Sequence, residues 1–188
     1  MNTIRTFIAI ETPEELKPEI ATLQKQLIAT HADVKWEHEK KFHITVKFLG
    51  DVKETMMPGL LSHLDSVLRE YSGFPLTYKG LGCFPNMRLP RIVWVGAHNN
   101  DGKLLEIYTA IEDELISFGF KREKNQFTPH ITIGRVRSER GTPDLISTLE
   151  KLTLEPRTFR IHEIVVMRSV LKQSGSEYEV LQTIQLQI

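Results

Sequence analysis

The chain has 188 residues and no net charge, with 24 Lys and Arg against 24 Asp and Glu. This balance argues against a surface that coats nucleic acid broadly, and the 40% hydrophobic content is ordinary for a globular protein. The single cysteine, Cys83, excludes an internal disulfide and indicates a reducing compartment, where we expect a buried thiol. Without an apolar run of membrane-spanning length or a signal-peptide pattern, we expect a cytoplasmic monomer that does not contact membranes.

Strand and helix signals alternate along the chain. Strands are expected at 4–10, 74–84, 91–97, 160–171 and 178–188. Helices are expected from near Pro13, where Thr12 and Glu15 form a capping-box pattern, and then over 55–70, over 102–118 and from Thr142. This alternation predicts an α+β fold with two mainly antiparallel sheets flanked by helices.

Two further strand candidates carry one motif, His43-Ile-Thr45-Val and His130-Ile-Thr132-Ile. Because side chains alternate along a strand, each His shares a face with its Thr, and the aliphatic residues and Phe48 face the other way. A single His of this kind is usually a satisfied histidine on a sheet, but chance does not readily produce two matched copies. The pair therefore predicts a functional site.

The two histidines are 87 positions apart, from 43 to 130, and the same offset aligns other elements. Shifted by 87 positions, strand 4–10 aligns with strand 91–97, and residues 76–84 align with residues 163–171. The helix starts near residues 13 and 55 align with the helix starts near residues 101 and 142. Such self-similarity indicates an internal duplication. We expect residues 1–188 to form one domain of two pseudo-symmetric lobes, with the motif faces on opposite sides of a cleft.

Two imidazoles with flanking hydroxyls suit general acid–base catalysis on a phosphodiester. One His would deprotonate water and the other would protonate the leaving oxygen. The hydroxyls of Thr45 and Thr132 would hold the non-bridging oxygens. No metal-ligand spacing or nucleophile elbow occurs in the sequence, so this arrangement requires no metal or other cofactor.

The motifs also carry a family resemblance, together with five other segments: Arg5-Thr-Phe7, Val34-Lys-Trp36, Phe84-Pro-Asn86, Trp94-Val-Gly96 and Met167-Arg168. The chain resembles the 2H phosphoesterase superfamily and, within it, the RNA 2′,3′-cyclic phosphodiesterases, also called 2′-5′ RNA ligases. This resemblance implies a bilobal fold with a catalytic cleft between the lobes. It further implies that His43 donates a proton to the departing 3′ oxygen and that His130 accepts one from water. Relatives often have Tyr where this chain has Met167.

Six more residues are candidates for substrate binding: Arg135, Arg5, Phe7, Arg168, Phe127 and Trp36. Strict alternation points Arg135 away from His130, and only a bulge at Gly134 would turn it inward. The three aromatic side chains could stack on a base, with core packing as the alternative role.

The favoured function is hydrolysis of RNA 2′,3′-cyclic phosphate ends to 2′-phosphomonoesters, with RNA 3′ ends as the binding partner. One alternative is a protein that binds RNA ends without turnover. Another is a phosphodiesterase or ligase that acts on 2′-5′ linkages, and small cyclic nucleotides are also possible substrates.

Overall fold

The computed structural model describes residues 2–173 and 175–187. The strands are β1 (Thr3–Glu11), β2 (Val34–Trp36), β3 (His43–Lys53), β4 (Phe74–Phe84), β5 (Ile92–His98), β6 (His130–Val136), β7 (Arg157–Ile161), β8 (Glu163–Lys172) and β9 (Gly175–Gln185). The α-helices are α1 (Lys17–Ile28), α2 (Met57–Leu68), α3 (Lys103–Glu114) and α4 (Thr142–Leu149), and short 3-10 turns occur at η1 (Glu39–Lys41), η2 (Glu54–Met56) and η3 (Leu115–Phe118).

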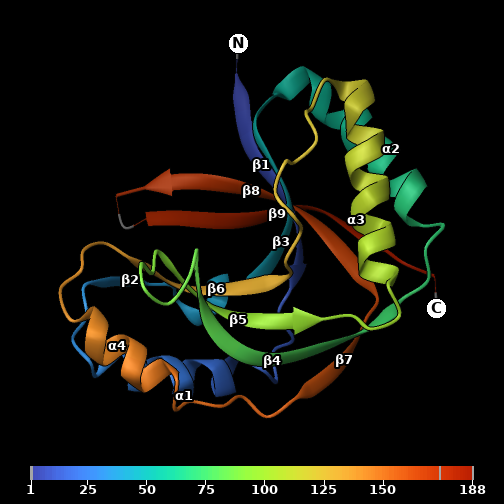
Figure 1. Ribbon diagram of the computed structural model, residues 1–188. Coiled ribbons are helices and arrows are strands. Elements are labelled where there is room, and N and C mark those ends of the chain that lie inside the picture. The colour runs from blue at the N-terminus through green and yellow to red at the C-terminus, as the bar shows by residue number, and fades with distance from the viewer. Residues whose placement is uncertain (1, 174, 188) are drawn as a thin grey trace.

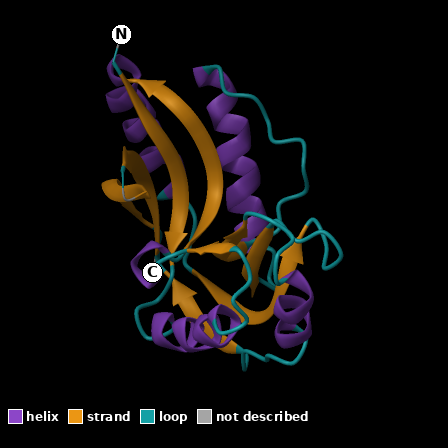
Figure 2. Cartoon of the chain, turned by 90° about the vertical axis from the view of Figure 1, so that its left-hand side faces the viewer, coloured by secondary structure: helices purple, strands orange, loops and turns teal. Residues whose placement is uncertain are grey.

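The predicted fold class is confirmed: long antiparallel strands curl through the molecule and helices lie against them (Figures 1 and 2). The strand order is β7-β4-β5-β6-β3-β1-β8-β9, with β2 paired to β6. The two sheets expected from the sequence are joined into one, because β3 and β6 meet through a single pair, Ile44 and Ile131. The two motif strands therefore form the seam of the sheet.

The helices lie in two pairs, α1 beside α4 and α2 beside α3 (Figure 1). We call β1, β3, β8, β9, α2 and α3 the β3 lobe, and β2, β4 to β7, α1 and α4 the β6 lobe. Each lobe therefore takes elements from both halves of the chain. The strand order is the same on the two sides of the seam. Outward from it, one side runs β3, β1, β8 and the other runs β6, β5, β4, and each strand is related to its counterpart by the 87-residue offset. We propose on this basis that the chain is one domain of two pseudo-symmetric, interwoven lobes.

The core lies on the face of the sheet opposite the two histidines. Ile44, Ile131 and Val95 are fully buried there, each contributing on the order of 1.5–3 kcal/mol relative to exposure. Cys83 is buried as expected, and this burial raises the pKa of its thiol to about 11. The motif strands are thus held from behind by close-packed apolar side chains.

Two expected elements differ from the structure. Helix α1 begins at Lys17 after a turn, and the hydroxyl of Thr12 is buried without a hydrogen-bond partner in the described residues, so the capping box is wrong. The strand expected over 160–171 is two strands that are interrupted at His162. The interruption has a physical reason: Ile161 pairs with Phe74 in the β6 lobe, whereas Ile164 pairs with Ile184 in the β3 lobe.

Among the described helices, none has the length and apolar character needed to span a membrane.

Candidate active site

The seam brings the two motifs together. Because Ile44 pairs with Ile131, the first residues of β3 and β6 lie side by side, each strand with its His and Thr half-buried on the face opposite the core. The positive charge of His130 helps to lower the pKa of His43, as expected for two rings that share one cleft. The four residues predicted to form the site are therefore neighbours.

Both histidine rings are oriented by the same hydrogen bond. The Nδ1 atom of His43 lies 2.7 Å from the carbonyl oxygen of Lys41, and Nδ1 of His130 lies 2.7 Å from that of Thr128. A carbonyl can only accept, so each Nδ1 carries the proton and each neutral ring presents an unprotonated Nε2. The Nε2 atom of His43 lies 3.1 Å from Oγ1 of Thr45. Each Nε2 is thus the atom that can exchange a proton with a ligand.

The surroundings favour neutral imidazoles. Burial lowers the pKa of both His43 and His130, and the guanidinium of Arg135 lowers both further. The carboxylate of Glu37 opposes this effect at His43. A bound phosphate would act in the same direction as Glu37, because negative charge stabilises the imidazolium.

A β-bulge turns Arg135 toward the histidines. Along β5, the partner of Val93 is Gly134 but the partner of the next residue, Trp94, is Thr132, so Ile133 is the extra residue of β6. The side chain of Gln24, on α1, donates to the carbonyl of Ile133 at 2.8 Å. The sequence allowed an inward Arg135 only with a bulge at Gly134, and the bulge lies one residue earlier, at Ile133.

Glycine is required beside this bulge. A Cβ on Gly134 would lie 2.8 Å from the ring of Trp36, which is closer than side chains pack. Trp36 is half-buried against this position, so it packs at the base of the bulge. Arg135 extends from the same point with half of its side chain exposed, and its Nε lies 3.3 Å from Oε1 of Glu37.

Strand β3 contains an equivalent bulge. Ile8 pairs with Lys47 and the next residue, Ala9, pairs with Thr45, which leaves Val46 as the extra residue. The bulge corrects one sequence expectation: Phe48, assigned by alternation to the apolar back of the strand, is 68% exposed and lies beside Phe7 at 6.0 Å. Period-two alternation fails here because the bulge adds one residue.

Aromatic rings support both histidines from the side. Phe7 is 2% exposed and packs against His43 and Tyr178 at centroid distances of 5.0 and 5.1 Å, so it supports the site and offers no free face for a base. Tyr178 also packs edge-on against His43 at 5.2 Å. In the β6 lobe, Phe84 packs edge-on against His130 at 4.9 Å.

Tyr178 is a site residue that the sequence did not reveal. Its pKa is raised, first by burial and then by the carboxylate of Glu37, while Arg135 and Arg5 act in the opposite direction. Its ring packs on His43, so the side chain lies beside the first motif. Met167 pairs with Phe7 and is buried, and the tyrosine beside His43 comes from β9, the strand next to β8. No signal in the sequence related position 178 to the motifs.

The remaining candidates lie in different places. Arg5 shares a strand face with Phe7 and acts electrostatically on Tyr178, so it lies on the cleft side. Arg168 pairs across the sheet with Thr6, which contacts Met57 on the helical side, and its NH1 lies 3.8 Å from Oε2 of Glu179. The structure therefore does not bring Arg168 into the site.

Phe127 lies in the loop that leads into the second motif strand. It stacks face to face on Tyr108, with centroids 4.2 Å apart and an angle of 3° between the rings. One face of Phe127 is thus already covered by Tyr108, which makes packing its observed role.

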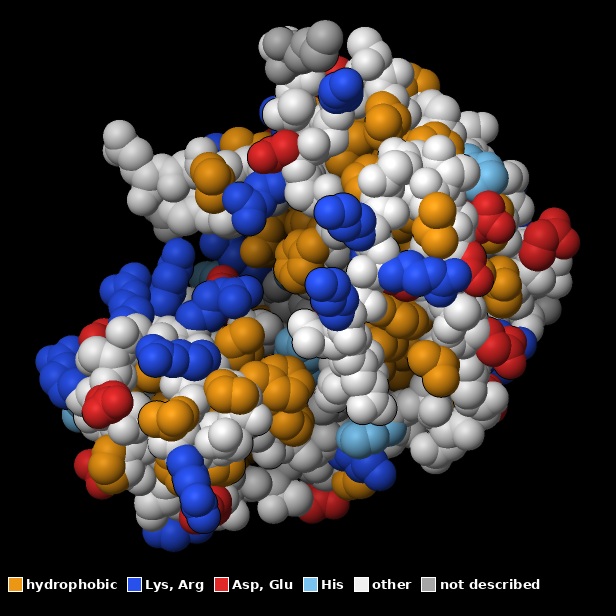
Figure 3. Space-filling model, turned by 45° about the horizontal axis from the view of Figure 1, so that its top comes forward, with side chains coloured by type: hydrophobic (Ala, Val, Ile, Leu, Met, Phe, Trp, Pro, Cys, Tyr) orange, Lys and Arg blue, Asp and Glu red, His pale blue; other side chains and the backbone are white. Residues whose placement is uncertain are grey.

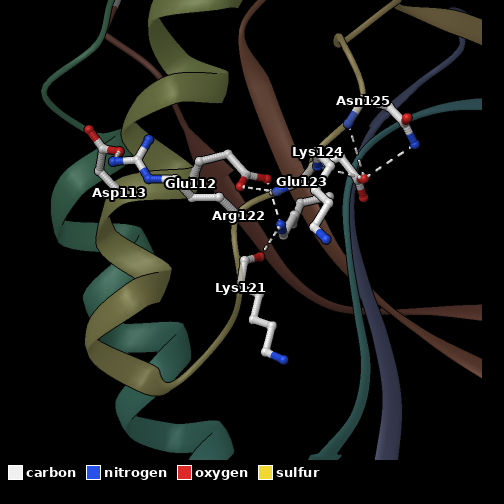
Figure 4. A network of polar contacts seen from close by, with 8 residues as sticks. Glu112, Asp113, Lys121, Arg122, Glu123, Lys124 and Asn125 are labelled. Atoms are coloured by element: carbon white, nitrogen blue, oxygen red, sulfur yellow. Dashed lines mark hydrogen bonds and ion pairs between the residues drawn. The ribbon is translucent and has the colours of Figure 1, made fainter.

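A buried ion pair holds the segment before the second motif. The Nζ atom of Lys47, next to the β3 bulge, lies 2.6 Å from Oε1 of Glu112 and donates to the carbonyl of Lys121 at 2.8 Å. The second carboxylate oxygen of Glu112 accepts from the backbone N–H of Glu123 (Figure 4). Helix α3 thereby connects the first motif strand to the loop that leads to the second.

Within residues 2–173 and 175–187, no three His, Cys, Asp or Glu side chains are grouped so that they could hold a metal ion.

Comparison with known proteins places this geometry in a family. The family model described as the 2′-5′ RNA ligase superfamily matches residues 10–173. A Methanocaldococcus jannaschii protein named RNA 2′,3′-cyclic phosphodiesterase is 36% identical over 179 residues, covering 95% of this chain and 98% of its own. A Thermotoga maritima protein of the same name is 34% identical, with coverages of 95% and 93%.

Solved structures agree at the level of the fold. The protein TT0787 from Thermus thermophilus superposes with a TM-score of 0.80 at 22% identity, covering 97% of each chain. Apo LigT from E. coli gives a TM-score of 0.79 at 21% identity over the full length of both chains.

Proposed function

Because the chain belongs to the 2′-5′ RNA ligase superfamily, we propose that it hydrolyses RNA 2′,3′-cyclic phosphate ends to 2′-phosphomonoesters. Relatives at 36% and 34% identity are named for the cyclic phosphodiesterase activity. The observation that carries the proposal is the matched pair of rings: His43 and His130 flank one seam, and each has its Nδ1 proton held by a backbone carbonyl. Two such rings can serve as a base and an acid in one reaction.

In the proposed reaction, water attacks the phosphorus of the cyclic ester and the bond from phosphorus to the 3′ oxygen breaks. His130 takes the proton of the attacking water at Nε2, and His43, protonated before the reaction, gives its Nε2 proton to the departing 3′ oxygen. The products are a 2′-phosphomonoester and a free 3′ hydroxyl. The family resemblance supplies the choice of His43 as donor and His130 as acceptor.

Hydroxyls and cations would hold the charge that develops on the phosphate. Thr45 and Thr132 can donate to the non-bridging oxygens, which frees Nε2 of His43 from its contact with the Thr45 hydroxyl. Arg135 lies close enough to both rings to lower their pKa, and it would neutralise the same negative charge. We propose that the reaction needs no metal, so activity should survive exhaustive treatment with a strong chelator.

The decisive experiment incubates the protein with a short RNA that ends in a 2′,3′-cyclic phosphate and separates the products against authentic 2′- and 3′-phosphate standards. We expect the 2′-phosphate alone, because one acid and one base fixed on opposite sides of phosphorus allow one leaving oxygen. A mixture or a 3′-phosphate would contradict the proposed roles. Binding without turnover would instead support an RNA-end-binding protein.

The family name also keeps action on 2′-5′ linkages as a second candidate. A 2′-5′-linked dinucleotide assayed in parallel tests this. Turnover faster than that of the cyclic phosphate would make the linkage the preferred substrate.

A further inference from the structure

Two lysines from the β6 lobe side of the cleft converge on the tip of the β8–β9 hairpin. A Cβ built on Gly175 would lie 3.6 Å from Nζ of Lys35, in β2, and 3.9 Å from Nζ of Lys41, at the end of η1. Gly175 has a φ of +120°, which favours glycine, so the backbone itself approaches the two ammonium groups. The start of β9 thus lies beside a pair of cations.

This pair of cations is continuous with the reaction centre. Lys35 is the cross-strand partner of Arg135, which acts on both histidines. Lys41 supplies the carbonyl that orients the ring of His43. Figure 3 shows Lys and Arg side chains gathered on both sides of the hollow between the hairpin, at upper left, and the lobe below it. A positively charged path therefore leads from the histidines outward.

Within the part of the chain that the structure describes, the two lysines lack anionic partners. Across residues 2–173 and 175–187, neither Lys35 nor Lys41 forms an ion pair, whereas Lys172 and Arg168 on the hairpin are paired with Glu177 and Glu179. Like charges that converge without a carboxylate repel one another, and an anion between them would remove that cost. Since the whole chain carries no net charge, the excess is a local property of this cleft.

We propose that Lys35 and Lys41 bind backbone phosphates of a single-stranded RNA, on the 5′ side of the nucleotide that reacts. The inference rests on the proposed function and narrows its substrate class. A mononucleotide has a single phosphate, which the two histidines engage, whereas an RNA strand has further phosphates that can follow the charged path. The substrate is thus the end of an oligonucleotide, whose strand leaves the reaction centre past the two lysines.

The first test compares kcat/KM for a short single-stranded RNA ending in 2′,3′-cyclic phosphate with that for a mononucleoside 2′,3′-cyclic phosphate. In the Lys35→Gln/Lys41→Gln variant we expect the RNA-to-mononucleotide ratio of kcat/KM to fall about tenfold, because two phosphate contacts are lost. The control Lys25→Gln/Lys151→Gln removes the same charge from exposed positions on α1 and after α4, and its ratio should not change. An unchanged ratio in the first variant would overturn the proposal.

A binding measurement separates this inference from the proposed function. Fluorescence anisotropy with a labelled RNA ending in 2′-phosphate requires no turnover. The slope of log K against log salt is about −0.7 for each phosphate contact on a single strand, so the double variant should reduce its magnitude by about 1.4. If neither substrate is hydrolysed, the proposed function fails, but this slope still shows whether Lys35 and Lys41 bind RNA phosphates. An unchanged slope overturns the lysine site even when hydrolysis is normal.

Discussion

Val46 and Ile133 are each the extra residue of a β-bulge, and they stand 87 positions apart at the same point of the two motif strands. Each bulge turns the next outward residue toward the cleft, which is Phe48 in β3 and Arg135 in β6. The two strands are therefore alike in backbone but different in chemistry. One lobe presents an aromatic surface beside its histidine, and the other presents a cation.

Replacing Arg135 should change both the rate and its pH dependence. Arg135→Gln should lower kcat/KM for the cyclic phosphate on the order of 10–100-fold, through loss of charge stabilisation. It should also move the pH optimum upward, because the guanidinium lowers the pKa of both histidines and its removal lets both rise.

The matched control for Arg135 is Arg168→Gln, since Arg168 lies outside the site and is paired with Glu179. Its kcat/KM and pH profile should match those of the unsubstituted protein. Equal effects of the two substitutions would show that Arg135 has no specific role in the reaction.

The free enzyme should work best on the acidic side of the ordinary histidine range. The base must be neutral, so kcat/KM rises with pH through its pKa, and the acid must be protonated, so kcat/KM falls above its pKa. Burial lowers both pKa values from 6.5, which displaces both limbs of the bell toward lower pH. The two limbs belong to the coupled pair. A rate that climbs steadily beyond neutral pH would be incompatible with a histidine acid.

Tyr178 should act as a positioning residue through its ring. Tyr178→Leu removes the edge contact with His43 and should lower kcat about tenfold, since a small misplacement of a catalytic group is costly. Tyr178→Phe keeps the ring and should recover most of kcat while leaving the pH profile unchanged. If Phe is as poor as Leu, the hydroxyl rather than the ring is the functional group.

The ion pair between Lys47 and Glu112 predicts an asymmetric cost. Both side chains are almost fully buried, at 7% and 3% exposure, so Glu112→Gln leaves a buried cation and should reduce the free energy of unfolding by about 3–5 kcal/mol. Arg69→Gln, which breaks the partly exposed pair with Asp65, should cost less than about 1 kcal/mol. Urea unfolding of both variants compares the two costs. Equal costs would contradict the role given to the buried pair.

Local patterns in the sequence predicted the placement of the two motifs. His43, Thr45, His130 and Thr132 were brought together as the repeated motif and its offset indicated. Alternation within a strand is local, which explains why the faces of Ile44 and Ile131 were also predicted correctly.

What the sequence did not reveal depends on long-range pairing. The bulges at Val46 and Ile133 exist only in relation to the neighbouring strands, so the reversal of Phe48 could not be read from its own strand. Tyr178 reaches His43 because β9 pairs with β8, at the far end of the chain. The interweaving of the lobes has the same cause, since no local signal shows which half of the chain supplies a helix.

The central claim is that His43 and His130 act as acid and base in one step, and a double-mutant cycle on kcat tests it most directly. Each single change, His43→Ala or His130→Ala, should lower kcat on the order of 10²–10⁴-fold. The double variant should be little worse than the poorer single variant, because groups that act in one step are not independent. His63→Gln, on α2 and paired with Glu114, is the control that should keep full activity. Multiplicative losses in the double variant, or unimpaired kcat in either single variant, would contradict the account.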